Sequence, residues 1–238
     1  MTKAAAFRYE GSELSLFAEA SHWKRYFARS LRPFMGASVL EVGAGIGGTT
    51  RALCGRGHRR WLCLEPDEAL ADQLHERIRI GKLPAFCERR VGTLSNLPVS
   101  ERFDTITYID VLEHIERDRE ELERATEYLN PGGYLVVLAP AHQWLFSPFD
   151  AAVGHFRRYS RRSLLGLGPS GTRVVRARYL DSVGLLASLA NRVILRNALP
   201  TAGQIRVWDG YMVPCSRFLD SIFRYNFGKT VIVVWQRS

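Results

Sequence analysis

The chain has 238 residues with 33 Lys and Arg against 24 Asp and Glu, a net charge of +9, and 46% of its residues are hydrophobic. These values are ordinary for a globular protein and exclude disorder, collagen and coiled coil as overall descriptions. The four cysteines show no CxxC spacing, which argues against a zinc cage or a disulfide framework. The N-terminus lacks a signal-peptide pattern, and no apolar run is long enough to span a bilayer. We expect one domain over residues 1–238 and a cytoplasmic location.

The positive charge is nearly all arginine, since the chain has only four lysines. An excess of this size permits contact with nucleic acid, an anionic membrane or a phosphorylated substrate, and it requires none of them.

The spacing of apolar residues alternates between helical and extended along the chain. Strands that alternate with helices at this pitch are typical of a doubly wound parallel sheet, whose two covered faces explain the unbroken apolar runs. In chain order we predict helix 14–31, strand 38–42, helix 49–54, strand 60–65, helix 66–80, strand 85–91, strand 102–110, helix 118–129, strand 134–138, strand 173–180, helix 182–200 and strand 230–236.

Two of the predicted helices carry end signals. Pro66 suits the first turn of helix 66–80, and Gly81 suits its end. Asp118 and Glu121 resemble a capping pair at the start of the helix that they open.

A glycine-rich turn follows the first predicted strand, with the sequence Glu-Val-Gly-Ala-Gly-Ile-Gly-Gly over residues 41–48. Glycines at a strand-to-helix turn permit positive φ and let a ligand approach the backbone closely. Glu65 ends the second strand, where an acid can accept hydrogen bonds from both hydroxyls of a ribose. The pattern predicts a cofactor that contains adenosine, without saying which one.

Four motifs in order narrow this choice: VLEVGAGIGG, LCLEPDEAL, FDTITYIDVLEHI and LNPGGYLVV. Together they resemble the class I S-adenosylmethionine-dependent methyltransferases, in particular the small-molecule enzymes of the UbiE/UbiG type. The resemblance covers residues 36–140 closely, and the closing strand extends it to the C-terminus. It implies a Rossmann-like, seven-stranded, mostly parallel sheet with an antiparallel last strand and helices on both faces. It also implies S-adenosyl-L-methionine as cofactor.

The resemblance assigns roles to individual cofactor residues. The turn is expected to line the methionine part of the cofactor, with Glu41 orienting it. Glu65, next to Pro66, is expected to hold the ribose. The resemblance also places Thr93 and Leu94 beside the adenine, and Asp110 and Val111 beside the methionyl group. The residues of the turn that it implies as contacts are Gly43, Gly45 and Gly47. Many relatives have Asp where this chain has Thr93.

A long segment without clear periodicity, residues 140–160, follows the fifth predicted strand, and we call it the acceptor loop. Long connections at the carboxyl edge of a parallel sheet are usually functional. His142 or His155 is expected to take a proton from an acceptor hydroxyl, with Asp150 orienting one of them. Acceptor contacts are expected from Tyr9, Trp144, Asp150, Arg157 and Arg158, the two arginines as clamps for a carboxylate or phosphate. We expect no metal, because His142, Asp150 and His155 lack the spacing of ligands on a helix.

Several of these residues could have a purely structural role instead of a functional one. Glu113, His114 and Glu116 fit a solvated helix start equally well, and the arginines fit a solvated helix entry. Residues 1–35 are expected to form a helical lid in which Phe17 and Trp23 either cover the site or pack in the core. Residues 182–228 form an insertion that packs on the sheet, mediates a homodimer or contacts a membrane surface, with packing favoured.

We therefore predict a methyltransferase that acts on a small or lipid-linked metabolite, with oxygen as the preferred target. An RNA or protein methyltransferase is the alternative. The sequence has no NPPY-type tetrapeptide after the fourth predicted strand, which argues against an enzyme that acts on nucleic acid. A non-catalytic cofactor-binding scaffold and a nicotinamide-dependent enzyme are further alternatives.

Overall fold

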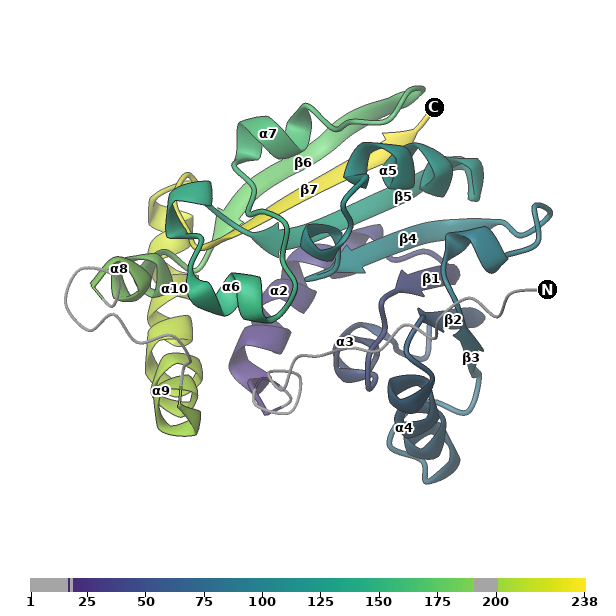
Figure 1. Ribbon diagram of the computed structural model, residues 1–238, viewed down its shortest axis with the longest axis horizontal. Coiled ribbons are helices and arrows are strands. Elements are labelled where there is room, and N and C mark those ends of the chain that lie inside the picture. The colour runs from purple at the N-terminus through teal and green to yellow at the C-terminus, as the bar shows by residue number, and fades with distance from the viewer. Residues whose placement is uncertain (1–16, 18, 191–200) are drawn as a thin grey trace.

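In the computed structural model, which describes residue 17 and residues 19–190 and 201–238, seven strands form one sheet in the order β3-β2-β1-β4-β5-β7-β6 (Figure 1). The neighbours from β3 to β5 pair in parallel, whereas β7 runs antiparallel to both β5 and β6. This confirms the predicted doubly wound, mostly parallel sheet with an antiparallel last strand. The strands are β1 Ser38–Val42, β2 Arg60–Glu65, β3 Cys87–Val91, β4 Phe103–Ile109, β5 Leu129–Pro140, β6 Thr172–Leu180 and β7 Thr230–Arg237.

Helices cover both faces of this sheet because the strands alternate their side chains between two buried cores. Helices α2, α3, α4, α9 and α10 contribute to one core, and α5 and α7 contribute to the other. The α-helices are α2 Ser21–Leu31, α3 Gly48–Leu53, α4 Glu68–Arg79, α5 Asp118–Glu127, α6 Pro148–Ala152, α7 Arg161–Leu165, α8 Ser182–Ala190, α9 Ala202–Val207 and α10 Val213–Ile222. The shorter turns are η1 Arg32–Phe34, η2 Leu94–Asn96, η3 Leu112–His114, η4 Gln143–Leu145 and the π-helical η6 Trp208–Met212.

The predicted capping pair of α5 is wrong. The N-cap of α5 is Arg117, and no side chain in the described part of the chain caps this helix. Asp118 instead accepts a hydrogen bond from the Tyr159 hydroxyl at 2.8 Å, and Glu121 accepts one from Tyr108 at 2.9 Å. Folding brings these distant tyrosines to the two acids, and the tertiary partners displace the local pairing that the sequence suggested.

Other boundaries differ modestly from the prediction. α4 begins after Pro66, because the Asp67 carboxylate accepts the Leu70 N–H at 3.0 Å and so caps the helix. β5 begins five residues before its predicted start. The predicted helix 182–200 is observed as α8, and residues 191–200 lie outside the described part. Within the described residues, no helix combines the length and apolarity needed to cross a membrane.

Candidate functional site

The turns after β1, β2, β4 and β5 meet at one edge of the sheet, since the carboxyl ends of parallel strands share an edge (Figure 1). The turn after β1, residues 43–48, is the glycine loop. Three of its glycines have positive φ: 66° at Gly43, 52° at Gly45 and 79° at Gly47. A Cβ on Gly43 would lie 2.5 Å from the nearest methyl carbon of Val111, which follows β4. Glycine at position 43 therefore lets the two turns pack directly against each other.

Glu41 lies buried beneath the glycine loop. Its Oε2 accepts hydrogen bonds from the Thr50 hydroxyl at 2.8 Å and from the Trp61 indole N–H at 2.7 Å. Its Oε1 is buried and has no hydrogen-bond partner among the described residues. Burial raises the pKa of this carboxyl to about 7, although the two hydrogen bonds oppose the rise.

Glu65 ends β2 and connects it to the glycine loop. Its two carboxylate oxygens accept the backbone N–H groups of Gly45 at 2.7 Å and Asp67 at 3.0 Å. Burial raises its pKa above the ordinary value, and these hydrogen bonds oppose the rise. Each oxygen keeps a second lone pair, so the carboxylate can accept two further hydrogen bonds. Pro66 follows directly and is only partly buried.

The turn after β3 contains Thr93 and Leu94. Thr93 is exposed, and its backbone N–H and hydroxyl both donate to the Asn96 side chain, at 2.8 and 3.3 Å. Leu94 is fully buried and packs in the core. At this turn, therefore, the Thr93 hydroxyl already serves a local cap.

Asp110 directly follows β4 and has a left-handed conformation with φ 54°. The side chain is exposed, but protein surrounds it closely enough to raise the pKa of its carboxyl to about 6. The nearby charges of His155 and Lys229 oppose that rise. The acceptor loop and the start of β7 therefore reach the same place as the turn after β4.

Glu113, in η3, is 1% exposed, and neither of its carboxylate oxygens has a hydrogen-bond partner among the described residues. Burial raises its pKa well above the ordinary value, and the charge of Asp110 adds to the rise. His155 Nε2 lies 4.0 Å from Glu113 Oε1, and the His114 and His155 rings meet edge to face at 4.6 Å. One ligand atom from each of these three residues lies within 4.8 Å of the others, so the group has the dimensions to hold a cation.

The acceptor loop is fixed to the protein along its length. Its two ends pair through Ala141 and Tyr159, and the Phe156 N–H donates to the Glu113 carbonyl at 2.8 Å. In its middle, Asp150 is fully buried at the start of α6. The loop is thus an ordered part of the carboxyl edge.

Asp150 pairs with His155 and with Arg158. The His155 Nδ1 donates to Asp150 at 2.8 Å, and Arg158 donates to both carboxylate oxygens at 2.8 and 2.9 Å. Burial alone would raise the pKa of Asp150, but these hydrogen bonds outweigh it and hold the pKa well below its ordinary value. The carboxylate is therefore ionised and orients the His155 ring.

His142 has different surroundings. Its Nε2 lies 3.0 Å from the Gly228 carbonyl and donates to it, and its ring stacks on Tyr179 at 5.1 Å. Burial lowers its pKa. Trp144, 49% exposed, lies 5.3 Å from the His142 ring. Of the two predicted histidines, the structure brings only His155 to Asp150.

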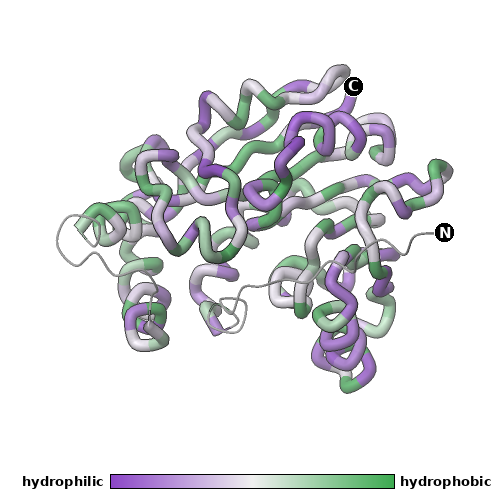
Figure 2. Tube along the Cα trace, in the orientation of Figure 1, coloured by the Kyte–Doolittle hydropathy of each residue, from purple (hydrophilic) through white to green (hydrophobic). Residues whose placement is uncertain are grey.

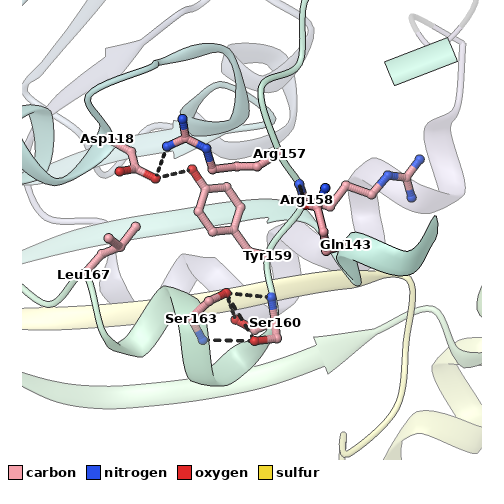
Figure 3. A pocket seen from close by; sticks show the side chains of 8 residues that line it. All are labelled: Asp118, Gln143, Arg157, Arg158, Tyr159, Ser160, Ser163 and Leu167. Carbon is pink, nitrogen blue, oxygen red and sulfur yellow. Dashed lines mark hydrogen bonds and ion pairs between the residues drawn. The ribbon is translucent and has the colours of Figure 1, made fainter. Parts of the chain in front are cut away.

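The two predicted arginine clamps are engaged with carboxylates of the chain itself. Arg157 pairs with Asp118 at 2.6 Å and also donates to the Glu116 carbonyl, while Arg158 holds Asp150. Figure 3 shows Arg157 and the Tyr159 hydroxyl converging on Asp118, with the Arg158 guanidinium pointing away. A pocket of about 380 Å³ lies at this end of the acceptor loop; its lining residues are Asp118, Gln143, Arg157, Arg158, Tyr159, Ser160, Ser163 and Leu167.

Of the aromatic residues proposed for an N-terminal lid, two pack in the core and one lies outside the described residues. Trp23 is buried against Trp208, with ring centroids 5.8 Å apart, and Phe17 meets Trp208 edge to face at 5.9 Å. Core packing, the alternative left open for both, is thus confirmed. Tyr9 lies outside the described residues. Lys24 of α2 lies beside Gly48, where a Cβ would be 3.2 Å from its Nζ, so α2 borders the glycine loop.

Sequence reasoning missed Lys229, which lies just before β7. Its Nζ is 3.5 Å from Asp181 Oδ2 and 3.9 Å from the centre of the Trp208 ring, and burial lowers its pKa. It also influences Asp110 electrostatically. The one signal in the sequence was that Lys229 is the only lysine after residue 82.

The chain is similar in sequence to known methyltransferases. The family model described as "Methyltransferase domain" matches residues 40–135. The ubiquinone biosynthesis O-methyltransferase of Azorhizobium caulinodans is 31% identical over 111 residues, 46% of this chain and 43% of that protein. The ribosomal RNA small subunit methyltransferase A of Xanthobacter autotrophicus is 49% identical over 49 residues, 21% of this chain and 17% of that protein. The match to each of these curated relatives thus spans less than half of its length.

Among solved structures, coclaurine N-methyltransferase bound to N-methylheliamine and S-adenosylhomocysteine superimposes with a TM-score of 0.60 at 15% identity. The match covers 97% of this chain and 75% of that one, and it shows a shared fold.

Proposed function

We propose that this chain, whose residues 40–135 match the methyltransferase-domain model, is a class I S-adenosylmethionine-dependent methyltransferase that transfers a methyl group to a small or lipid-linked metabolite. Oxygen is the preferred target atom. The pair formed by the buried Asp150 and the partly buried His155 carries the proposal, because a base positioned at the carboxyl edge of the sheet is what an acceptor hydroxyl needs. The match to an O-methyltransferase supports the choice of oxygen.

The residues at the edge fit S-adenosylmethionine. The lone pairs left on Glu65 suit two ribose hydroxyls, and the orphaned Oε1 of Glu41 suits a positive ammonium group reached through water. The backbone of the glycine loop, at Gly43, Gly45 and Gly47, would line the methionine part. The other proposed contacts are Pro66 at the ribose, Thr93 and Leu94 at the adenine, and Asp110 and Val111 at the methionyl group.

When bound, this cofactor supplies a methyl group on a positively charged sulfur, which is already activated toward a nucleophile. The chain's own residues then have to hold an acceptor and remove its proton. The Nδ1–H of His155 points to Asp150, so its Nε2 carries the lone pair and accepts the hydroxyl proton. The ionised Asp150 stabilises the imidazolium that results.

Acceptor contacts in this proposal come from Trp144, Arg157, Arg158 and Tyr9. An acceptor carboxylate or phosphate would share the two arginines with Asp118 and Asp150. His142 remains a second candidate base, with Nδ1 as its proton acceptor, since Nε2 donates to Gly228. A cytoplasmic location belongs to the proposal, and the four free thiols support it.

A nucleic-acid acceptor is the second candidate. The short match to a ribosomal RNA methyltransferase and the net charge of +9 favour it. A cofactor-binding scaffold without turnover is the third.

The experiment is a transfer assay with methyl-labelled S-adenosylmethionine and host-cell extract separated into lipid, small-metabolite, RNA and protein fractions. Label in the lipid or metabolite fraction supports the proposal, and label in RNA or protein overturns it. Tight cofactor binding with no label in any fraction favours the scaffold. Each assay is repeated with EDTA and with added Mg²⁺ or Zn²⁺, because Glu113, His114 and His155 could hold a cation.

A further inference from the structure

The chain leaves the sheet after β6 and forms a group of helices before it returns as β7. We call the described part of this group, residues 182–190 and 201–228, the helical cap; it contains α8, α9, η6 and α10. It starts at the carboxyl end of β6 and ends beside Lys229, so it borders the candidate site (Figure 1).

The inner side of the cap is fixed by buried carboxylates. Asp220 accepts the Tyr26 hydroxyl at 2.6 Å and the Ser182 N–H at 3.0 Å. Asp209 accepts the backbone N–H groups of His22 at 3.1 Å and Trp23 at 2.8 Å, at the start of α2. The cap is therefore held in one orientation against α2 and the sheet.

The outer side of the cap is apolar and exposed. On η6 and α10, Tyr211 is 73% exposed, Phe218 67% and Ile222 57%. Their spacing of seven and four residues places them on one side of the helix, together with the exposed Cys215. We call these four residues the outer stripe. More than half of the exposed large apolar side chains in the described residues lie on the cap; the others there are Leu186, Leu189, Val207, Phe223 and Phe227. Figure 2 shows α8 largely in the hydrophobic colour.

The exposed charges of the cap all have one sign. Arg206, Arg217 and Arg224 are exposed, whereas the two acids of the cap, Asp209 and Asp220, are both buried and hydrogen-bonded. The sequence of residues 182–228 contains no Glu, and its remaining arginines are Arg192 and Arg196 in the undescribed part.

We propose that the helical cap docks on an anionic lipid surface, with the outer stripe inserted among the lipids and the arginines on the head groups. Aromatic and aliphatic side chains beside arginines are the composition of helices that lie in a membrane interface. A symmetric pair of caps would place arginines opposite arginines, which disfavours a second copy of the chain as the occupant. The proposal does not depend on methyl transfer.

The native Cys215 provides the test, because it lies on the outer stripe while Cys63 and Cys87 are buried and Cys54 is partly buried. The full-length chain is labelled there with an environment-sensitive fluorophore. It is mixed with vesicles of phosphatidylcholine alone, or of phosphatidylcholine and phosphatidylglycerol in equal amounts. We expect a blue shift with the anionic vesicles only, and co-flotation of the protein with them. A label on the Cys215→Ser/Val99→Cys variant, at the 84% exposed Val99 in the turn before β4, should show no shift.

Substitutions separate the two parts of the proposed surface. Tyr211→Ser/Phe218→Ser should weaken vesicle binding at least tenfold, and Arg206→Glu/Arg217→Glu should remove the preference for anionic lipid. Arg56→Glu/Arg59→Glu, which reverses two exposed arginines in the turn before β2, is the matched control and should bind as the original chain does. Circular dichroism checks that each variant folds. The proposal is overturned if the chain binds neither vesicle, if the control weakens binding equally, or if the serine variants instead dissociate a dimer.

Discussion

The His155 Nδ1 lies 2.8 Å from a carboxylate oxygen of Asp150, whose side chain is completely buried, and the guanidinium of Arg158 donates to both oxygens of that carboxylate. The arrangement fixes which nitrogen of His155 carries the proton. It also links the middle of the acceptor loop to its end, so that the position of the base depends on a single buried charge.

Removing the base or its orienting group should lower turnover. We expect His155→Gln to reduce kcat by about 10²–10⁴-fold, because a positioned general base contributes on that order. We expect Asp150→Asn, which removes the group that orients the base, to reduce kcat at least tenfold. Cofactor affinity, measured by calorimetry, should stay the same in both. His75→Gln, an exposed histidine on α4, is the control. Full turnover in His155→Gln would mean that His142 is the base or that the reaction uses none. Loss of turnover in His142→Ala would then identify His142 as the base.

Glu65 should contribute to cofactor affinity more than any exposed acid nearby. Glu65→Gln retains one acceptor oxygen but places an amide beside the Gly45 or Asp67 N–H, so we expect a loss of about 1–3 kcal/mol in binding. Glu68→Gln, on the exposed first turn of α4, should leave affinity unchanged. Equal affinities of all three proteins would mean that another residue holds the ribose.

The close approach of Gly43 to Val111 predicts a rescue. Gly43→Ala should weaken cofactor binding at least tenfold, because its Cβ would overlap the Val111 methyl groups. Val111→Ala removes those methyl groups, so the double variant should bind more tightly than Gly43→Ala alone. Gly81→Ala is the matched control: its φ is also positive, at 74°, but apart from its chain neighbours no described residue has an atom within 4 Å of the added Cβ. If the double variant binds no better while Val111→Ala alone binds as the original chain does, the loss comes from backbone strain.

Glu41 should make the folded chain less stable as pH rises. Its pKa is about 7 in the folded chain against an ordinary 4.5, so between these values the folded state binds more protons than the unfolded state. The contribution is complete below the ordinary pKa and is lost as pH rises through the folded pKa, in total about 3 kcal/mol. Glu41→Gln does not titrate and keeps an oxygen for Thr50 and Trp61.

Urea unfolding of both proteins, without cofactor, at about pH 5 and about pH 8 measures this effect. Between these two pH values the variant should gain about 2.5 kcal/mol of stability relative to the original chain, which is most of the total. If the difference in unfolding free energy between the two proteins is the same at both pH values, Glu41 is already ionised at the lower pH.

The amino-acid sequence by itself determined the sheet, the glycine loop and the acid at the end of β2. Each depends on local rules: apolar runs form buried strands, and a tight turn with positive φ requires glycine. For that reason, predicted strands such as 38–42 and 60–65 agree with β1 and β2 to the residue.

Only the tertiary structure decided which side chains meet at the carboxyl edge. Asp150 lies eight residues from His142 and five from His155, so distance along the chain does not select its partner; the fold of the acceptor loop against η3 does. Asp118 and Lys229 likewise find partners from segments distant in sequence. The burial of the Glu113 carboxylate, whose oxygens have no hydrogen-bond partner among the described residues, depends on every element packed around it, and no local pattern encodes it.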